Sequence, residues 1–211
     1  MPEKLRKDAV KRGVDLVLAV FGIVVLSPLL VLITILIRLT SGSPALFRQR
    51  RPGLNNEIFV LYKFRTMRED RGQNGLQRSD EARLTRLGRL LRRSSLDELP
   101  ELWNVIRGDM SLIGPRPLLV EYLPLYSAED LRRHEVKPGI TGLAQVSGRN
   151  LLDWEERFKL DVWYVDHWSI GLDCRIFLRT IARVWRMDGI SGRGHATMEP
   201  YRGKNQRRGV A

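Results

Sequence analysis

The longest apolar segment of the chain lies near its N-terminus. No charged residue interrupts Leu16 to Ile37, a length close to the ~20 residues that a helix needs to cross the hydrocarbon core of a bilayer. The segment is too long for the apolar region of a cleaved signal peptide, and no obvious small-residue cleavage site follows it. The pattern therefore predicts a membrane-embedded helix.

Two features distinguish this segment from a simple transmembrane helix. Ser27 and Pro28 interrupt it, and a proline there removes a backbone hydrogen bond and bends the helix, while the serine can bond the freed carbonyl. Basic residues also flank both ends: Arg6, Lys7, Lys11 and Arg12 before it, and Arg38, Arg48, Arg50 and Arg51 after it. Because basic flanks favour the cytoplasmic side, the segment is either a re-entrant helix that returns to the same face or an ordinary kinked transmembrane helix.

The segments after the apolar helix predict a small amount of β-structure. Leu46–Gln49 and Ile58–Phe64 are short β-prone runs, and the turn-forming pairs Pro52-Gly53 and Asn55-Asn56 lie between them. This arrangement predicts a β-hairpin.

Residues 83–95 and 173–187 both have apolar positions at helical spacing, with arginines on the other faces. The arginines are Arg83, Arg86, Arg89, Arg92 and Arg93 in the first segment, and Arg175, Arg179, Arg183 and Arg186 in the second. Such a basic amphipathic helix either covers a core with its arginines in water or lies in the plane of an anionic membrane surface. Beside a membrane segment, we favour the membrane surface.

The composition of the chain predicts an anionic partner. The 36 Lys+Arg against 24 Asp+Glu give a formal net charge of +12, which favours nucleic acid, an anionic membrane or a phosphorylated substrate. Nucleic acid is the least favoured of these, since the sequence has no zinc-ligand spacing, ribonucleoprotein-type aromatic motif or clear helix-turn-helix. The single cysteine, Cys174, excludes an internal disulfide framework and fits a reducing compartment.

Two adjacent carboxylates, Asp97 and Glu98, follow the first arginine-rich segment directly. Ser95 and Glu98 fit a capping box, S-x-x-E, so one interpretation is a helix N-terminus. Pro100 would then lie in the early turns of that helix, where proline is costly, although it is favoured at the first helical position. A helix that begins after Leu99 would leave both acids on its approach, free to face a cleft.

Further along, the sequence has features of a phosphate-binding site. Pro115 and Pro117 fix the backbone on both sides of Arg116, and a guanidinium held in this way suits bidentate binding of phosphate. A rigid turn with a solvated arginine is the alternative. The glycine-punctuated segment 136–150 adds three polar candidates, in backbone that can approach a ligand closely: Lys137, Gln145 and Arg149.

Together these features predict phosphoryl chemistry at a membrane surface. An aspartate such as Asp97 can attack phosphorus and form an acyl phosphate, which divides one difficult displacement into two. A diphosphate donor normally binds with Mg²⁺, which prefers carboxylate and phosphate oxygens. The cations expected to neutralise the transferred group are Lys63, Arg92, Arg93 and Arg116.

In order and spacing, several segments resemble the bacterial monotopic phosphoglycosyl transferases. These segments are KRGVDLVLAV, LSPLLVLI, RPGLNNEIFVLYKFRTM, RLTRLGRLLRRSSLDELPELWNVIRGDMSLIGPRPLLVEYLPLY, HEVKPGITGLAQVSGRN and WEERFKLDVWYVDHWSIGLD. The resemblance extends from about Lys11 to Asn205. Within the family, the short length and the ending ISGRGHATMEPYRGKN are most similar to the branch that transfers N,N′-diacetylbacillosamine 1-phosphate.

The resemblance implies a reaction and a location. A UDP-sugar, with an N-acetylated amino sugar by likeness to that branch, would give its sugar 1-phosphate to undecaprenyl phosphate and release UMP. This would be the first membrane step of bacterial glycan or glycoprotein biosynthesis, at the cytoplasmic face of the inner membrane. The alternatives are transfer of a hexose 1-phosphate (glucose or galactose) for exopolysaccharide or O-antigen synthesis, and a non-catalytic basic scaffold. The expected partners are the UDP-sugar, undecaprenyl phosphate and anionic phospholipid, without nucleic acid, and a homodimer is left open.

The resemblance also implies roles for single residues. Asp97 matches the covalent nucleophile of the family's Asp-Glu pair, Mg²⁺ is expected at Asp97 and Glu98, and Glu98 either ligates the metal or takes a proton from the lipid phosphate. Ser27–Pro28 matches the break of a re-entrant helix and favours that alternative. The other matched positions are Lys63 in the YKF-x-TM motif, Arg116 in the PRP motif, and Gln145, Arg149 and Asp161 near the nucleotide-sugar. Leu143 stands where the family has an aromatic residue, a departure that bears on sugar specificity.

We therefore expect an α+β fold that is mainly α-helical, with a re-entrant membrane helix and a small interfacial catalytic domain containing amphipathic helices and a short β-hairpin. In this organisation, residues 1–40 form the membrane helix-break-helix, residues 41–205 the catalytic domain on the cytoplasmic face, and residues 206–211 a tail.

Overall fold

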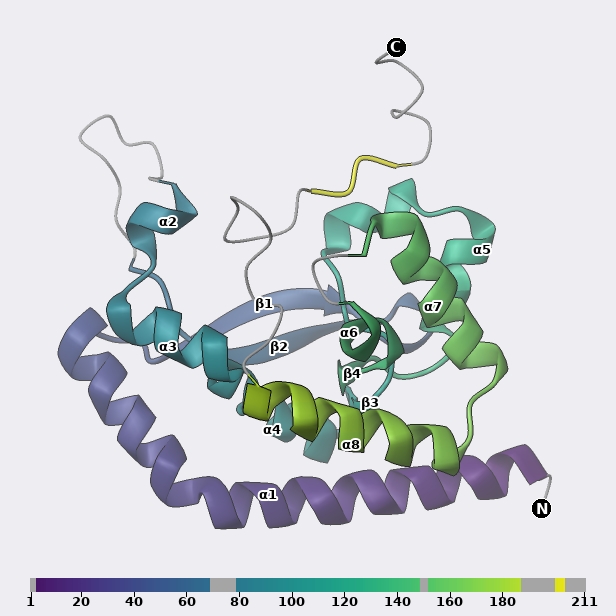
Figure 1. Cartoon of the computed structure of the whole chain (residues 1–211), viewed down its shortest axis with the longest axis horizontal. Helices are drawn as coiled ribbons and strands as arrows, with labels where there is room; N and C mark the ends of the chain where they lie inside the picture. The colour runs from purple at the N-terminus through teal and green to yellow at the C-terminus, as the bar shows by residue number, and fades with distance from the viewer. Residues whose placement is uncertain (1–2, 69–78, 149–151, 187–199, 204–211) are drawn as a thin grey trace.

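The computed structural model describes residues 3–68, 79–148, 152–186 and 200–203. The fold is α+β and mainly helical, as predicted. A long N-terminal helix, α1 (Glu3–Ser41), runs along one side of a domain in which short helices surround two small pairs of strands (Figure 1). The other elements are, in chain order, β1 (Leu46–Pro52), η1 (Leu54–Asn56), β2 (Ile58–Phe64), α2 (Asp80–Arg83), α3 (Arg86–Ser94), η2 (Leu96–Glu98), α4 (Glu101–Arg107), β3 (Ser111–Ile113), η3 (Val120–Leu125), α5 (Ala128–Leu131), η4 (Arg132–His134), β4 (Gly139–Thr141), α6 (Leu143–Ser147), α7 (Trp154–Asp166) and α8 (Ile170–Arg186).

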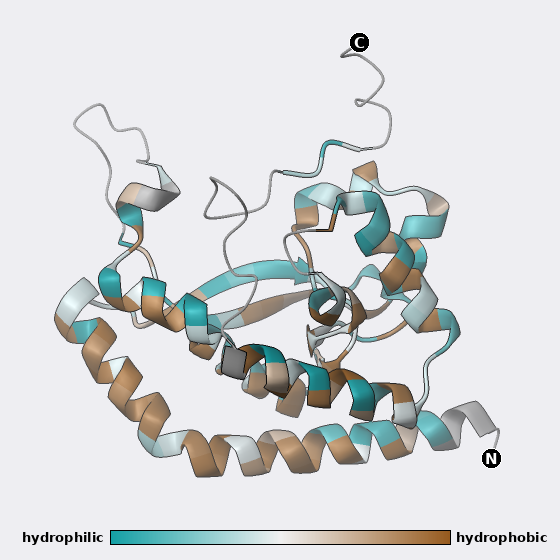
Figure 2. Ribbon diagram, viewed as in Figure 1, coloured by the Kyte–Doolittle hydropathy of each residue, from teal (hydrophilic) through white to brown (hydrophobic). Residues whose placement is uncertain are grey.

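Helix α1 carries the predicted apolar segment and bends along its length (Figure 1). Pro28 lies inside the helix, and the Ser27 hydroxyl donates a 2.8 Å hydrogen bond to the carbonyl of Val24. This carbonyl is the one that Pro28 leaves without a donor, because proline has no N–H. The predicted compensation by the serine is therefore confirmed. Figure 2 shows an apolar arm of the helix on each side of a paler stretch at the bend.

Both arms of α1 contact the rest of the chain. In the first arm, Lys11 forms a 2.5 Å ion pair with Asp173 of α8, and Arg12 donates to two backbone carbonyls in the last turn of α4. In the second arm, Ile33 and Ile37 are buried beside residues of β2 and α3. The helix is thus attached to one side of the domain near both of its ends.

The outward side of α1 is apolar and exposed. Within the described residues, Lys7–Ser41 is the one helix long and apolar enough to cross a membrane, and little of its most apolar stretch is buried. Val17 and Leu39, one from each arm, are 67% and 78% exposed. Such an apolar surface is costly in water, so the protein associates with a membrane.

Strands β1 and β2 form the predicted antiparallel hairpin, with Leu46 opposite Phe64 at one end and Pro52 opposite Ile58 at the other. The first strand continues beyond its predicted end at Gln49. Its additional residues pair with apolar residues of β2, and such cross-strand contacts outweigh the weak β-preference of charged side chains.

Both basic helices form, with bounds that differ from the prediction. Helix α3 begins after Thr85, not at residue 83, because the Thr85 hydroxyl caps it by accepting a 2.8 Å bond from the N–H of Gly88. Helix α8 begins at Ile170, before residue 173, and the Ser169 hydroxyl accepts a 3.1 Å bond from the N–H of Leu172.

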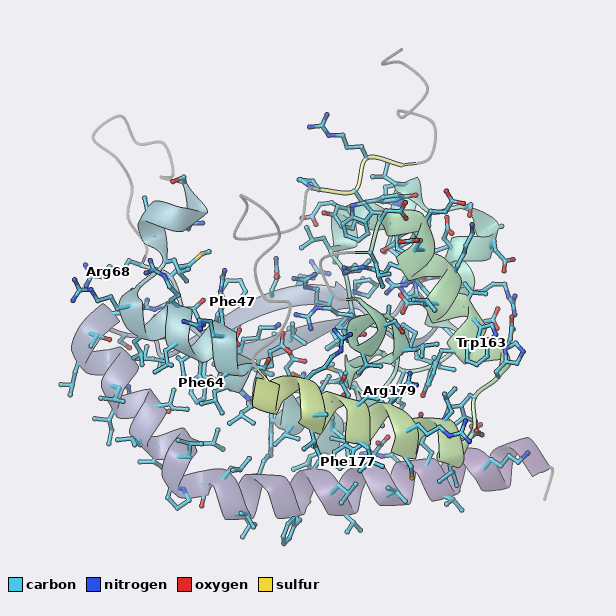
Figure 3. The ribbon with its side chains drawn as sticks, viewed as in Figure 1. Phe47, Phe64, Arg68, Trp163, Phe177 and Arg179 are labelled. Carbon is cyan, nitrogen blue, oxygen red and sulfur yellow. The ribbon has the colours of Figure 1, made fainter. Side chains whose placement is uncertain are left out.

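The apolar sides of the two basic helices have different environments. In α3, Leu91 is buried in a cluster with Phe64 of β2 and residues of α1. In α8, Ile176 is buried, whereas a second group of apolar side chains is exposed: Phe177, Leu178 and Ile181. Figure 3 shows Phe177 on the side of α8 nearer α1 and Arg179 on the other side. Phe177, one of these exposed apolar residues, therefore lies on the side of α8 that faces α1.

Candidate active site

The predicted acid pair lies in the connection between α3 and α4. Ser95 ends α3 in the left-handed region (φ 57°), and its side chain makes no capping hydrogen bond. The capping-box interpretation is therefore wrong. Asp97 and Glu98 lie in the short 3-10 helix η2, and α4 begins only after Pro100. This start is one residue later than the one predicted from the proline, because Pro100 is the N-cap and not the first helical residue. It still leaves both acids on the approach to the helix.

Glu98 is the centre of the polar contacts at this site. Its Oε1 atom accepts a hydrogen bond from Lys63 Nζ at 2.7 Å and one from Arg116 Nη2 at 2.5 Å. Lys63 comes from β2 and Arg116 from the segment after β3, so the fold brings together cations from distant parts of the sequence. Four predicted site residues are thus close together, because Asp97 is adjacent to Glu98 and interacts electrostatically with Lys63 and Arg116.

A parallel pair of strands, not predicted from the sequence, fixes the start of the segment that carries Arg116. Strand β3 pairs with β4, and the N–H of Gly139 donates to the carbonyl of Pro115 at 3.0 Å. A Cβ atom on Gly139 would lie 2.1 Å from the backbone nitrogen of Gly114, so glycine is required for this approach. This glycine in segment 136–150 therefore lets two strands approach each other.

A buried ion pair holds the backbone of Arg116 itself. Arg133 donates to the carbonyl of Arg116 at 2.7 Å and to the Asp161 carboxylate at 2.7 Å, and Arg133 and Asp161 are 1% and 2% exposed. Asp161 was predicted near the nucleotide-sugar. It lines the same cavity as Arg116, and its carboxylate is bonded to Arg133.

The two adjacent acids have opposite pKa shifts. Burial and the neighbouring charge of Glu98 raise the pKa of Asp97 to about 6, against the opposing effects of Lys63, Arg116 and Arg92. Burial also disfavours the ionised form of Glu98, but the charges and hydrogen bonds of Arg116 and Lys63 outweigh it and hold the pKa of Glu98 well below its usual range. Two adjacent carboxylates with opposite pKa shifts are typical of active sites, where one carboxylate stays charged while the other titrates near the working pH.

A third carboxylate, Glu101, was not predicted as a site residue. It is the first residue of α4 and is 1% exposed, with its Oε1 atom 3.1 Å from Lys63 Nζ. Burial, and to a smaller extent the charge of Glu98, raise the pKa of Glu101 to about 7, although Lys63 opposes the shift. Because Glu101 follows Glu98 by three residues, the sequence could have indicated that the two side chains lie on the same side of a helix. It could not have indicated that Glu101 is buried.

A cavity of about 380 Å³ opens beside these groups. Its polar lining includes Glu98, Arg116, Gln145, Arg157, Asp161 and Thr180. The two amide atoms of Gln145 are buried and have no hydrogen-bond partner among the described residues. Arg157 of α7 and Thr180 of α8 were not predicted, because both lie in amphipathic segments where such residues are ordinary.

The remaining predicted cations differ in their positions. Arg92 donates to the Thr66 hydroxyl at 3.0 Å and acts electrostatically on Asp97. The side chain of Arg93 is exposed and does not line the cavity. Arg149 lies outside the described residues.

The residues present suit a divalent metal that is shared with a substrate. No group of three metal-binding side chains occurs among the described residues, but Mg²⁺ commonly binds through one or two carboxylates and completes its shell with water and substrate phosphates. Glu98 uses Oε1 for both cations, and its Oε2 atom, like the Asp97 carboxylate, is in no side-chain bond within the described residues. Two carboxylates therefore remain available as ligands.

The chain is similar to known proteins along most of its length. The family model for bacterial sugar transferases matches residues 6–187. The chain is 51% identical over 193 residues to EpsL, an uncharacterized sugar transferase of Bacillus subtilis (strain 168), covering 92% of this chain and 96% of that protein. It is 42% identical over 181 residues to a UDP-glucose:undecaprenyl-phosphate glucose-1-phosphate transferase of Xanthomonas campestris pv. campestris, covering 81% and 37%.

A third relative has a different sugar in its name. A UDP-N-acetylgalactosamine-undecaprenyl-phosphate N-acetylgalactosaminephosphotransferase of Aeromonas hydrophila is 39% identical over 183 residues, covering 83% of this chain and 43% of that protein. The chain thus spans nearly all of EpsL and about two fifths of the other two relatives. It belongs to the bacterial sugar transferase family.

Proposed function

We propose that this protein transfers a sugar 1-phosphate from a UDP-sugar to undecaprenyl phosphate, with release of UMP. The observation that carries the proposal is Glu98, which is held between Lys63 and Arg116 and lines a cavity, with Asp97 next to it in a membrane-associated protein. The names of two relatives, which describe undecaprenyl-phosphate sugar phosphotransferases, support the same reaction.

In the first step, an oxygen of Asp97 attacks the phosphorus next to the sugar. A bond forms between Asp97 and phosphorus, the bond to the bridging oxygen of the diphosphate breaks, and UMP leaves with the electron pair. Asp97 suits the nucleophile better than Glu98, because both cations bind Glu98 and lower its basicity. Lys63 and Arg116 would stabilise the charge that develops on the phosphoryl oxygens.

In the second step, the phosphate oxygen of undecaprenyl phosphate attacks the same phosphorus. The new bond completes the lipid diphosphate-sugar, and the bond to Asp97 breaks, which restores the free carboxylate. The roles of Asp97 and Glu98 do not depend on the identity of the sugar, because both act on the phosphoryl group.

Mg²⁺ would bind at Asp97 and Glu98 together with the diphosphate of the donor. When bound, it would neutralise phosphate charge and orient the donor. Glu98 Oε2 is the protein atom best suited to this, since Oε1 already accepts two hydrogen bonds. The alternative role of Glu98, as a base toward the lipid phosphate, is disfavoured by its lowered pKa.

We propose a re-entrant path for α1 at the cytoplasmic face of the inner membrane. Both arms of the helix contact the same side of the domain, and Ser27 compensates for the break at Pro28. A helix that spans the bilayer would carry one of these arms away from the domain. The exposed apolar side chains of α8 support the same placement.

The candidates for the transferred sugar are few. The relatives' names give glucose and N-acetylgalactosamine, and the sequence predicts an N-acetylated amino sugar with a hexose as the alternative. A UMP-release assay with detergent-solubilised protein, Mg²⁺ and undecaprenyl phosphate tests the proposal. The donors are UDP-glucose, UDP-galactose, UDP-GlcNAc, UDP-GalNAc and UDP-N,N′-diacetylbacillosamine. We expect release with at least one donor and none from Asp97→Asn. Equal release by Asp97→Asn would contradict the proposal, and absence of release with every donor would favour a scaffold.

A further inference from the structure

The ammonium group of Lys63 lies between two carboxylates from different elements. Its Nζ atom is 2.7 Å from Glu98 Oε1 in η2 and 3.1 Å from Glu101 Oε1 in α4. The Glu101 side chain is 2% exposed, against 16% for Lys63 and 18% for Glu98. Glu101 is thus the innermost of the three groups and lies behind Lys63 with respect to solvent.

The position of Glu101 in its helix does not account for its burial. An acidic residue in the first turn interacts favourably with the helix dipole, but this effect operates at the surface and needs no burial. Removing a carboxylate from water costs several kcal/mol unless a cation compensates. A methionine or leucine at this position would avoid that cost, so the carboxylate points to a task that an apolar side chain would not perform.

The charged groups that act on Glu101 come from four parts of the fold. They are Arg51 of β1, Lys63 of β2, Glu98 of η2 and Arg116 of the segment after β3. Arg116 bonds to Glu98, and Arg51 donates to the Gln49 side chain and to a backbone carbonyl. Lys63 is therefore the cation in direct contact with Glu101.

We propose that Glu101 is a positioning residue that holds Lys63 for the phosphoryl transfer. This inference rests on the proposed function. An ammonium group has three N–H donors. Lys63 donates one to Glu98. The carboxylate of Glu101 attracts the ammonium group as an ion pair at 3.1 Å, although its Oε1 atom has no hydrogen-bond partner among the described residues. Lys63 is thus fixed from two sides and keeps donors for an oxygen of the transferred phosphate.

Loss of Glu101 would change what Lys63 does to the nucleophile. Lys63 already attracts Asp97 electrostatically. Without its inner partner, its ammonium group would be free to move toward the Asp97 carboxylate, and pairing there would lower the nucleophilicity of Asp97. The defect would appear in the chemical step, since Glu101 contacts Lys63 and is the most buried of the three groups.

Two variants of nearly equal shape test this role. Glu101→Gln keeps an oxygen that can accept from Lys63, whereas Glu101→Met has none. We expect kcat for UMP release within about threefold of the wild type for Glu101→Gln and at least about tenfold lower for Glu101→Met, with KM for the UDP-sugar changed less than about threefold in both. The unfolding temperature of Glu101→Met should equal or exceed that of Glu101→Gln, because an apolar side chain replaces a buried polar one. A purely structural role would not give higher stability together with lower kcat.

A double-mutant cycle with Lys63→Met makes the assignment to Lys63 specific. If Glu101 acts through Lys63, adding Glu101→Met to Lys63→Met should lower kcat by less than about twofold. Equal losses in both backgrounds, or equal kcat for Glu101→Met and Glu101→Gln, would overturn the inference. Wild-type UMP release is measured in the same experiment, so its absence would count against the proposed function, while an active wild type with an additive cycle would count against the role of Glu101 alone.

Discussion

The two adjacent acids at the centre of the site have different tasks because their surroundings differ. Glu98 is bound by two cations, and its pKa is well below its usual range. Asp97 has no such partner, and burial raises its pKa to about 6. The sequence predicted the pair, together with Lys63 and Arg116, from residue type and from proline positions. It did not predict which acid has the raised pKa and which has the lowered pKa, because this depends on which carboxylate oxygen each cation contacts.

The raised pKa of Asp97 predicts an acid limit on the first step. A protonated carboxyl group is a poor nucleophile, so the rate of UMP release without lipid acceptor should fall as the pH decreases through about 6, with the slope of a single proton. Mg²⁺ at the site favours the ionised form and should move the midpoint lower. The measurement is a single-turnover rate between pH 5 and pH 8. A rate that rises toward pH 5 would contradict the role of Asp97.

The same shift predicts an effect on stability. A carboxyl group whose folded-state pKa is raised stabilises the fold at low pH, and this contribution is lost as the pH rises through the folded-state pKa of about 6. At pH 8, Asp97→Asn should therefore be more stable than the wild type by roughly 1–3 kcal/mol, while it loses activity. Thermal unfolding at pH 8 and at pH 4 measures this, and the gain should vanish at pH 4. A lower unfolding temperature at pH 8 would show that the ionised carboxylate stabilises the fold.

At the scale of elements, the spacing of apolar residues and the turn residues predicted the helices and the hairpin, which local interactions determine. The apolar helix, the hairpin and both basic helices form where expected, and their bounds differ by a few residues because Thr85 and Ser169 cap the helices. The pairing of β3 with β4 was not predicted, since each strand has only three residues and they are far apart in sequence. The Arg133–Asp161 pair was missed for the same reason. Long-range pairing leaves no periodic signal along the chain.

In α8, we predict that substitution of the exposed apolar residues affects transfer to the lipid but not release of UMP from the donor. In the proposed placement its exposed apolar residues would contact the membrane, whereas Thr180 lines the cavity. Replacing Phe177, Leu178 and Ile181 by serine should lower transfer to undecaprenyl phosphate in vesicles at least about fivefold, because loss of buried apolar area weakens seating at the interface. Acceptor-free UMP release should stay near the wild-type rate. Arg179→Gln serves as the matched variant on the opposite side. Equal loss of both half-reactions would contradict an interfacial role for these residues.

For the molecule as a whole, the proposed reaction needs a water-soluble donor and a lipid acceptor at the same phosphorus. The fold meets this need by attaching a small polar domain to one side of a bent apolar helix (Figures 1 and 2). In the proposed placement, the net charge of +12 and the exposed apolar surface would act together at an anionic membrane. The sequence had predicted both. The contacts of both arms of α1 with one side of the domain add to its indications of a re-entrant path.

The re-entrant path predicts that both ends of α1 lie on the cytoplasmic side. In a Cys174→Ser background, single cysteines at Val10 and Thr40, both exposed, should react with a membrane-impermeant maleimide in inverted inner-membrane vesicles. Neither should react in intact spheroplasts. Labelling of the two positions from opposite sides would show that the helix spans the bilayer.

The central claim is that Asp97 carries the sugar phosphate between donor and acceptor. The most direct test is intact-mass measurement of the protein after incubation with the preferred UDP-sugar and Mg²⁺, without undecaprenyl phosphate. We predict a mass increase equal to one sugar phosphate in the wild type, its absence in Asp97→Asn, and its loss when undecaprenyl phosphate is added. A wild-type protein that turns over with acceptor but shows no adduct without it, or an adduct that persists in Asp97→Asn, would contradict the account.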